Sequence, residues 1–305
     1  MLQTSPQICY VLSSTGTDLY AQMTCISASL SRRLYTDAKI VLLVDEVTNL
    51  NLARCQSPLL ALANQTICLQ TDLESAGARS RFVKTSMRQV VDGDFVFIDA
   101  DALPIRKFDE IDSTGAAMAA ALDLDEFSGR PRFPPFAVER LHACGWSAPL
   151  PQYFNSGVIF MADTPEIRTF GEEWHRRWQR IFAATGDYRD QPSFNSAIDA
   201  VGLKVHVLPD AFNATVYISP WKARHARILH YWMNYADGRA PENSLLAHLL
   251  NSWRATSQID WEAVERAKKR PLSFNSWREI LIPLLGPRGR FPRKLLINLS
   301  KYFCS

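Results

Sequence analysis

The stretch Phe95-Val-Phe-Ile-Asp99-Ala-Asp101 runs from four apolar residues directly into two carboxylates. Its β-branched and aromatic composition predicts a buried strand that ends at Ile98. Side chains at positions i and i+2 of an extended chain share a face, so Asp99 and Asp101 can hold one hard divalent cation. Such a cation, Mg²⁺ or Mn²⁺, is commonly completed by phosphate oxygens of a substrate. An Asp-x-Asp triplet alone is weak evidence, because surface turns are rich in Asp.

Strands and a helix alternate on the amino-terminal side of this stretch. Residues 8–12 (Ile-Cys-Tyr-Val-Leu) and 40–44 (Ile-Val-Leu-Leu-Val) are short apolar runs typical of buried strands. Between them, apolar residues recur at helical spacing over residues 19–30, and Asp18 stands at the N-cap position. This order predicts a right-handed β-α-β unit with parallel strands.

The same alternation continues along the chain. It predicts an α/β fold with a doubly wound sheet and ligands at the carboxyl ends of the strands. Residues 123–151, rich in charge, Pro and Gly, predict an excursion beside the sheet. The further strands are expected at 66–69, 158–161, 205–208 and 226–231, and the further helices at 82–91, 166–184, 191–200 and 243–269.

Composition narrows the class of protein. The 305 residues are 47% apolar and 21% charged, which is ordinary for a globular chain. No apolar run reaches the roughly 18 to 20 residues of a membrane span, and residues 1–7 lack the features of a signal peptide. We therefore expect a cytoplasmic protein. Six scattered cysteines show no metal-ligand spacing, so we expect them to be buried free thiols.

Several motifs occur in an order that resembles the family 8 glycosyltransferases and their glycogenin-like relatives. Residues 95–111 resemble the family's Asp-x-Asp segment, and Tyr-Phe-Asn-Ser-Gly-Val-Ile-Phe-Met at 153–161 resembles its Asn-Ser-Gly strand. Asp-Gln-Pro-Ser-Phe-Asn at 190–195 and the segment 205–213 follow in the same order, and residues 13–21 resemble the nucleotide-contacting loop. The resemblance covers residues 8–231, roughly three quarters of the chain, and several ordered motifs are more specific than one.

The resemblance implies a GT-A fold, which is Rossmann-like and has a doubly wound mixed sheet in one catalytic domain. It also implies a metal-dependent, retaining transfer of a hexose from a UDP-sugar, UDP-glucose or UDP-galactose, to a saccharide acceptor. That acceptor would be bacterial lipopolysaccharide, capsule or another lipid-linked surface saccharide. The implied ligands of Mn²⁺ or Mg²⁺ are Asp99, Asp101 and His230. The implied sugar pocket contains Asn155, Asp190 and Gln191, with positioning roles at the reaction centre. The implied donor-binding residues are Ser13, Asp18, Tyr20, Lys84, Asp99, Ala100, Asp101 and Ser156.

Each of these residues also has a plainer interpretation. His230 can be a packed imidazole, and Lys84 an exposed helix charge. Asn155 can cap a turn, and Asp190 can cap the helix that it begins. Trp146, Trp221 and Trp232 can stack on a sugar or pack in a core.

The chain departs from the family pattern after His230. The usual glycine and phosphate-binding lysine are absent there, and Arg239 or Lys222 can supply that cation. Two other functional classes stay open. In haloacid-dehalogenase-like phosphatases the first Asp of such a motif is a nucleophile, but there the motif comes near the amino terminus and an acidic pair follows. A non-catalytic sugar-nucleotide-binding domain could keep the same fold.

The carboxyl-terminal end carries the basic excess. Residues 266–305 contain ten Lys or Arg and one acidic residue, a net charge of +9, whereas residues 1–265 carry −6. Residues 277–303 interleave cations with Leu, Ile, Trp and Phe, the composition of an interfacial membrane anchor. We therefore expect a catalytic domain at 1–257 and a helical, basic extension at 258–305 that contacts the inner face of the membrane and does not bind nucleic acid. The alternative is a basic cap packed on the catalytic domain.

Overall fold

A computed structural model describes residues 6–111, 115–123, 133–148, 152–216, 219–231 and 244–275. All structural statements below concern these residues.

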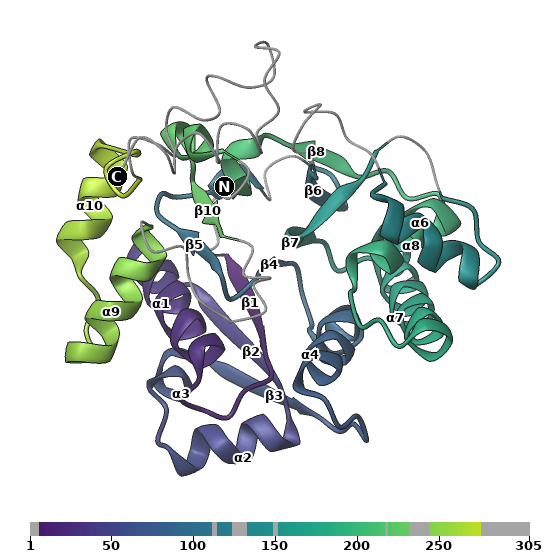
Figure 1. The fold of residues 1–305 in the computed structure, drawn as a ribbon, viewed down its shortest axis with the longest axis horizontal. Helices are drawn as coiled ribbons and strands as arrows, with labels where there is room; N and C mark the ends of the chain where they lie inside the picture. The colour runs from purple at the N-terminus through teal and green to yellow at the C-terminus, as the bar shows by residue number, and fades with distance from the viewer. Residues whose placement is uncertain are drawn as a thin grey trace, which may run out of the picture.

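A seven-stranded mixed sheet forms the centre of the molecule (Figure 1), with strand order β3-β2-β1-β4-β7-β6-β8. Strands β3, β2, β1 and β4 are mutually parallel, β7 is antiparallel to β4 and β6, and β8 is parallel to β6. The predicted α/β class and mixed, doubly wound sheet are confirmed. The strands are β1 (Gln7–Leu12), β2 (Lys39–Asp45), β3 (Gln65–Leu69), β4 (Phe95–Ile98), β6 (Met118–Leu122), β7 (Phe154–Met161) and β8 (His206–Leu208).

The reversed direction of β7 places its first residues at the edge where β1, β4 and β6 end. The Asp99 N–H donates to the Gly157 carbonyl across 2.8 Å, and the Asp123 N–H donates to the Tyr153 carbonyl across 2.7 Å. Segments after β4 and β6 therefore lie beside the segment that opens β7. This edge is where the sequence predicts ligand binding.

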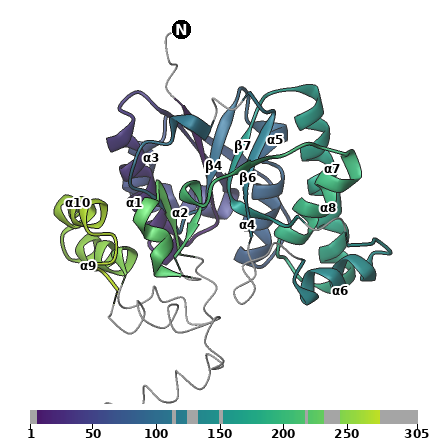
Figure 2. The ribbon, with the colours of Figure 1, turned by 90° about the horizontal axis from the view of Figure 1, so that it is seen from above.

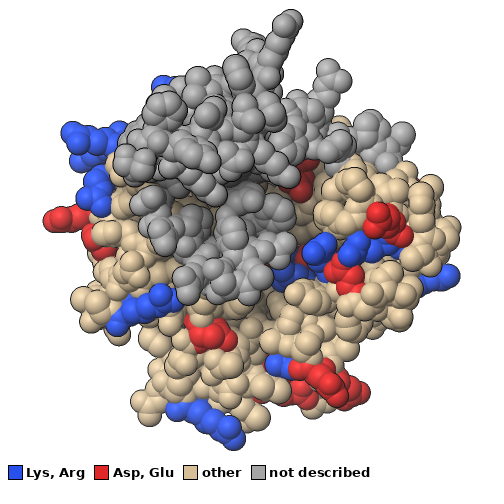
Figure 3. All heavy atoms as spheres, in the orientation of Figure 1, with Lys and Arg blue, Asp and Glu red and all other residues tan. Residues whose placement is uncertain are grey.

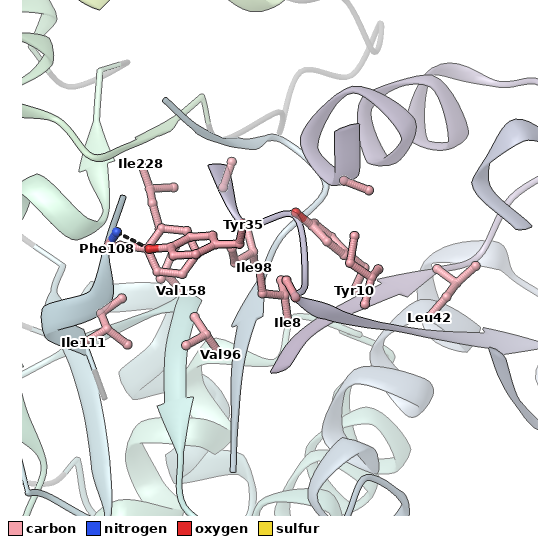
Figure 4. Close-up of a cluster of buried hydrophobic side chains, with 14 of the residues drawn as sticks. Ile8, Tyr10, Tyr35, Leu42, Val96, Ile98, Phe108, Ile111, Val158 and Ile228 are labelled. Carbon is pink, nitrogen blue, oxygen red and sulfur yellow. Dashed lines mark hydrogen bonds between the residues drawn. The ribbon is translucent and has the colours of Figure 1, made fainter. Parts of the chain in front are cut away.

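Helices cover both faces of the sheet. On one face Ile8, Tyr10 and Leu12 pack with residues of α1, and Figure 4 shows Ile8 and Tyr10 in this cluster with Ile98 and Val158 from the neighbouring strands. On the other face Cys9 and Val11 pack with residues of α4 and α7. Figure 2 shows these two helical layers on opposite sides of the strands. The helices are α1 (Leu19–Leu34), α2 (Glu46–Arg54), α3 (Pro58–Leu62), α4 (Ala76–Thr85), α5 (Met87–Val90), α6 (Pro135–Ala143), α7 (Pro165–Thr185) and α8 (Gln191–Val201).

Two helix predictions need correction. The helix expected at 82–91 is two helices, and α4 begins earlier, because the Ser75 side chain accepts from the Ala78 N–H as its N-cap. The helix expected at 243–269 is also divided into α9 (Leu245–Thr256) and α10 (Trp261–Lys269). Ser257 ends α9 with a left-handed φ of 55°, and the Asp260 side chain caps α10.

A second, three-stranded sheet brings distant parts of the chain together. Its order is β5 (Ala102–Pro104), β10 (Ile228–His230), β9 (Ala214–Thr215), and His230 pairs with Ala102. Residues of α9 and α10 pack on this sheet in one cluster with Leu103 and Leu229. Helix α10 thus shares the packing of α9, although it lies beyond the predicted domain boundary at residue 257. Three short 3-10 helices complete the described elements at Asp109–Ile111, Asp210–Phe212 and Pro220–His225.

The cysteine prediction is wrong in part. Cys9, Cys25 and Cys144 are buried free thiols, but Cys55 and Cys68 are exposed. Cys55 lies at the surface just after α2, and Cys68 belongs to β3, an edge strand of the main sheet. Cys304 lies outside the described residues.

Among the described residues, no helix has both the length and the apolar character needed to cross a membrane. On the described part of the face seen in Figure 3, acidic and basic side chains are interspersed. Six of the ten basic residues of the segment 266–305 fall at 276–305, outside the described residues.

Candidate active site

Asp99, Asp101 and His230 come together at the edge of the sheet. Each offers one ligand atom, and these atoms lie within 4.8 Å of one another. The Asp101 Oδ1 and His230 Nε2 atoms are 3.3 Å apart. Pairing of β5 with β10 causes this approach, since the Tyr231 N–H also donates to the Asp101 carbonyl across 3.1 Å. His230 is buried, whereas both carboxylates are partly accessible.

A chain of hydrogen bonds fixes the orientation of the His230 ring. The Gly157 N–H donates to Asn155 Oδ1 across 2.8 Å, and Asn213 Nδ2 donates to the same oxygen across 2.8 Å. Asn213 Oδ1 then accepts from His230 Nδ1 across 2.7 Å. Because an amide oxygen only accepts, the Nδ1 atom carries a proton and Nε2 faces the carboxylates. Two carboxylates and an imidazole nitrogen held in this way fit Mn²⁺ well and Mg²⁺ acceptably.

Electrostatics at this cluster also favour a bound cation. Burial lowers the pKa of His230, but the neighbouring Asp101 carboxylate raises it, and the net direction is upward. Burial raises the pKa of Asp99, while Lys84 opposes that shift. The Asp101 carboxylate therefore favours a positive charge at this cluster.

Gly157 leaves the space that the His230 ring occupies. A β-carbon at this position would lie 2.3 Å from His230 Cε1 and 2.9 Å from Asn155 Oδ1. Any larger residue must therefore displace the ring or the amide. The glycine of the Asn-Ser-Gly motif thus has a steric role.

Lys84 is buried and links two carboxylates. The residue is only 1% exposed, so the alternative of an exposed helix charge is wrong. The Nζ atom lies 3.1 Å from Asp99 Oδ1 and 3.2 Å from Asp190 Oδ2. Arg81, one turn earlier on α4, places its Nε 2.9 Å from Asp190 Oδ1. One face of α4 therefore supplies two cations to the site.

Asp190 belongs to this charge network. Its side chain makes no capping hydrogen bond to α8, so the helix-cap alternative is wrong. Instead it accepts from the Ser156 hydroxyl across 2.8 Å. Burial raises the pKa of Asp190, but the charges of Lys84 and Arg81 lower it by more, so the net direction is downward. Asp190 is thus an ionised carboxylate held in place from α4 and β7.

Gln191 and Asn155 lie beside this network, and Asp123, which belongs to none of the predicted site motifs, joins them. Gln191 Nε2 donates to Asp123 Oδ2 across 2.6 Å, and Gln191 Oε1 accepts from the Ser156 N–H across 3.2 Å. Burial raises the pKa of Asp123. The sequence contained a signal for Asp123, because it follows the apolar residues 118–122 as Asp99 follows residues 95–98.

The predicted nucleotide loop is ordered by its own side chains. Asp18 caps α1 by accepting from the Ala21 N–H, and it also accepts from the Ser14 hydroxyl. The Ser13 hydroxyl donates to the buried Asp45 across 2.5 Å. These hydrogen bonds shape the loop, whereas Tyr20 is 47% exposed and presents its ring to the surface. Ala100, which lies between Asp99 and Asp101 in the sequence, is partly buried and packs against the cluster that contains Leu103 and Leu229.

The remaining predicted residues have varied surroundings. Lys222 Nζ lies 3.0 Å from Asp210 and 3.1 Å from the Thr215 hydroxyl, so this cation already has protein partners. The Arg177 guanidinium lies over the Trp146 ring, 4.3 Å from the ring centre. The Arg224 guanidinium lies over the Trp221 ring, 5.6 Å from its centre. Arg239 and Trp232 lie outside the described residues.

Comparison with known proteins adds evidence on the fold. No protein-family model matches the sequence, and no curated protein matches it at a significant level. The crystal structure of the galactosyltransferase LgtC, in complex with donor and acceptor sugar analogues, superposes with a TM-score of 0.54 at 14% identity, over 82% of this chain and 99% of LgtC. An active-site variant of LgtC gives a TM-score of 0.52 at 14% identity, over 85% of this chain and 99% of that one. The chain therefore has the GT-A glycosyltransferase fold, as its resemblance to family 8 predicts.

Proposed function

We propose that this protein is a metal-dependent, retaining hexosyltransferase that moves a sugar from a UDP-hexose to a saccharide acceptor. The observation that carries the proposal is the convergence of Asp99, Asp101 and His230 at the edge where Asp190 and Gln191 also lie. The fold is shared with LgtC, a galactosyltransferase that binds donor and acceptor sugar analogues. UDP-glucose and UDP-galactose are the donors to test first.

Asp99, Asp101 and His230 would hold Mn²⁺ or Mg²⁺, which as a Lewis acid supplies charge stabilisation for a diphosphate leaving group. The protein groups around them have separate tasks. Lys84 and Arg81 hold Asp190 as an anion, and its Oδ1 atom, which otherwise accepts from Arg81, can accept a further hydrogen bond from a sugar hydroxyl. The Tyr20 ring, exposed at the start of α1, provides an apolar face for the nucleoside.

The test is a screen of nucleotide sugars for Mn²⁺-dependent turnover. We expect hydrolysis of UDP-glucose or UDP-galactose, and retention of the anomeric configuration in the product by NMR. Asp99→Asn and Asp101→Asn should each lower turnover at least ~100-fold, because each removes a charged ligand. Asp37→Asn, which changes an exposed carboxylate after α1, is the matched control and should leave turnover unchanged.

Other outcomes would point to other functions. Turnover that survives both substitutions would reject the metal site. Binding of UDP-sugars without turnover would indicate a non-catalytic sugar-nucleotide-binding domain. Phosphate release from simple phosphomonoesters, lost in Asp99→Asn, would indicate a haloacid-dehalogenase-like phosphatase.

We further propose a lipid-linked acceptor and peripheral contact with the inner face of the membrane, which would make this a cytoplasmic enzyme of surface-saccharide synthesis such as lipopolysaccharide. The support is the alternation of cations and apolar residues at 277–303, outside the described residues. Removing residues 286–305 should lower sedimentation with phosphatidylglycerol vesicles and spare donor hydrolysis. Equal loss of both would favour a basic cap that packs on the catalytic domain.

A further inference from the structure

We propose that Asp123 is a positioning residue that holds the side-chain amide of Gln191 in one orientation toward the sugar. The inference rests on the proposed function, since it concerns how that site is ordered. Asp123 follows β6, a strand separate from those that deliver Asp99 and His230. Its Oδ2 atom lies 2.6 Å from Gln191 Nε2, which makes this a short hydrogen bond to a carboxylate.

The chemistry of the partners determines which way the amide faces. A carboxylate oxygen only accepts, so the group beside Asp123 is the NH₂ of Gln191. The Ser156 backbone N–H only donates, so the group 3.2 Å from it is the Gln191 carbonyl oxygen. The two contacts act at opposite ends of one planar amide and exclude the flipped orientation.

The backbone around both residues is tied to the sheet. The Asp123 N–H donates to the Tyr153 carbonyl, which anchors the carboxylate to the segment before β7. The Asn195 side chain accepts from the Phe154 N–H across 2.6 Å and donates to the Phe154 carbonyl across 2.9 Å. Asn195 Nδ2 also donates to the backbone carbonyl of Gln191 across 3.0 Å. The amide and its anchor are therefore attached to the same two strands, β6 and β7.

The held amide keeps one N–H and one oxygen lone pair free of these two contacts. Gln191 and Asp123 are both partly accessible, so those groups can meet a sugar hydroxyl or ring oxygen. Without Asp123 the side chain can rotate about its terminal bonds, and a small misplacement at a reaction centre is costly. We expect Asp123→Ala to lower kcat ~10- to 30-fold with little change in the donor KM. Asp123→Asn keeps an acceptor of the same shape and should lose about threefold or less.

A double-mutant cycle on the full chain tests the proposal. If Asp123 acts through Gln191, Asp123→Ala should have almost no further effect on donor turnover in a Gln191→Ala background. If the losses of turnover from the two single substitutions add in the double variant, the proposal is overturned. It is also overturned if Asp123→Asn is as impaired as Asp123→Ala, because the charge of Asp123 would then be needed for a reason other than its hydrogen bond to Gln191. Asp199→Asn, an exposed substitution on α8, is the matched control.

A second readout is independent of activity. In the ¹⁵N spectrum of glutamine-labelled protein, the Gln191 side-chain resonances are assigned by their loss in Gln191→Ala. These resonances should move in Asp123→Ala, and their protons should exchange with water faster. Unchanged resonances would overturn the proposal. If the wild-type protein turns over no nucleotide sugar, the proposed function fails, and these spectra still decide whether Asp123 holds the amide.

Discussion

The absence of a side chain at Gly157 controls the position of the His230 ring, which we propose to be a metal ligand. We predict that Gly157→Ala lowers the affinity for Mn²⁺ about 10- to 100-fold, because a β-carbon would lie 2.3 Å from His230 Cε1 and must push the ring away from the carboxylates. Calorimetric titration with Mn²⁺ measures the change. His230→Ala gives the affinity that remains without the ring. An unchanged affinity in Gly157→Ala would show that the ring does not contribute to the metal site.

The residues of the site differ in how well the sequence alone predicts their roles. Asp99, Asp101 and His230 belong to motifs, and in the structure one oxygen or nitrogen atom of each lies within 4.8 Å of the others. Asn213 was seen only as the end of a motif, and Asp123 was missed, because their roles depend on contacts with β10 and α8 that no local pattern reveals. Lys84 was placed near the donor, but its burial follows from the way α4 crosses the sheet.

At the level of elements, α5 and α7 approach each other through a glycine. A β-carbon at Gly171 on α7 would lie 2.7 Å from the Arg88 β-carbon and 3.0 Å from its γ-carbon. Arg88 cannot easily yield, since it is fully buried and its guanidinium donates to carbonyls of Gly93 and Ala162. The contact thus fixes the distance between the two helices.

We predict that Gly171→Ala lowers the free energy of unfolding by about 1–3 kcal/mol, as overpacking does. Without this steric overlap the substitution would raise the stability, because alanine is favoured over glycine in a helix by about 1 kcal/mol. Urea titration followed by circular dichroism measures the change. Glu172→Ala, at the exposed next position on α7, should alter stability by less than about 0.5 kcal/mol. A more stable Gly171→Ala protein would mean that the helices separate without cost.

Elements were predictable where a single pattern dominates. The apolar runs of β1, β2 and β4 matched their strands closely, because each is buried on both faces. The start of α4 was missed, since residues 76–80 (Ala-Gly-Ala-Arg-Ser) lack helical periodicity and only the Ser75 cap marks it. The strand expected at 226–231 is confirmed as β10, whereas β5 and β9, with three residues or fewer, are defined by their pairing with β10.

Over the whole molecule, the site exists because one strand runs against the others. The sequence predicts a sheet whose carboxyl edge binds ligands, but it does not reveal that β7 is antiparallel to β4 and β6. That reversal carries the Asn155–Gly157 segment to the edge where β4 and β6 deliver Asp99 and Asp123. A uniformly parallel sheet would place this segment at the opposite edge.

The stability of the whole fold should also depend on pH through His175, a partly buried histidine of α7 that packs on α4. Burial lowers the pKa of His175 to about 4. Its ring packs beside Phe82 at 5.0 Å, and Nδ1 lies 2.8 Å from the Thr85 hydroxyl. The unfolded chain, with an ordinary histidine pKa of about 6.5, binds this proton more readily than the folded chain does. The free energy of unfolding should therefore fall as the pH is lowered from about 6.5 to about 4.

A substitution separates this effect from that of other groups. The raised pKa of His230 works in the opposite direction, because protonation there favours the folded state. The difference between wild type and His175→Asn isolates His175, since asparagine can replace the hydrogen bond to Thr85 and does not titrate. Urea titrations at several pH values should show a loss of about 2 kcal/mol between pH 6.5 and 4 in the wild type relative to the variant. Parallel pH profiles would mean that His175 becomes charged without disturbing the packing of α4 on α7.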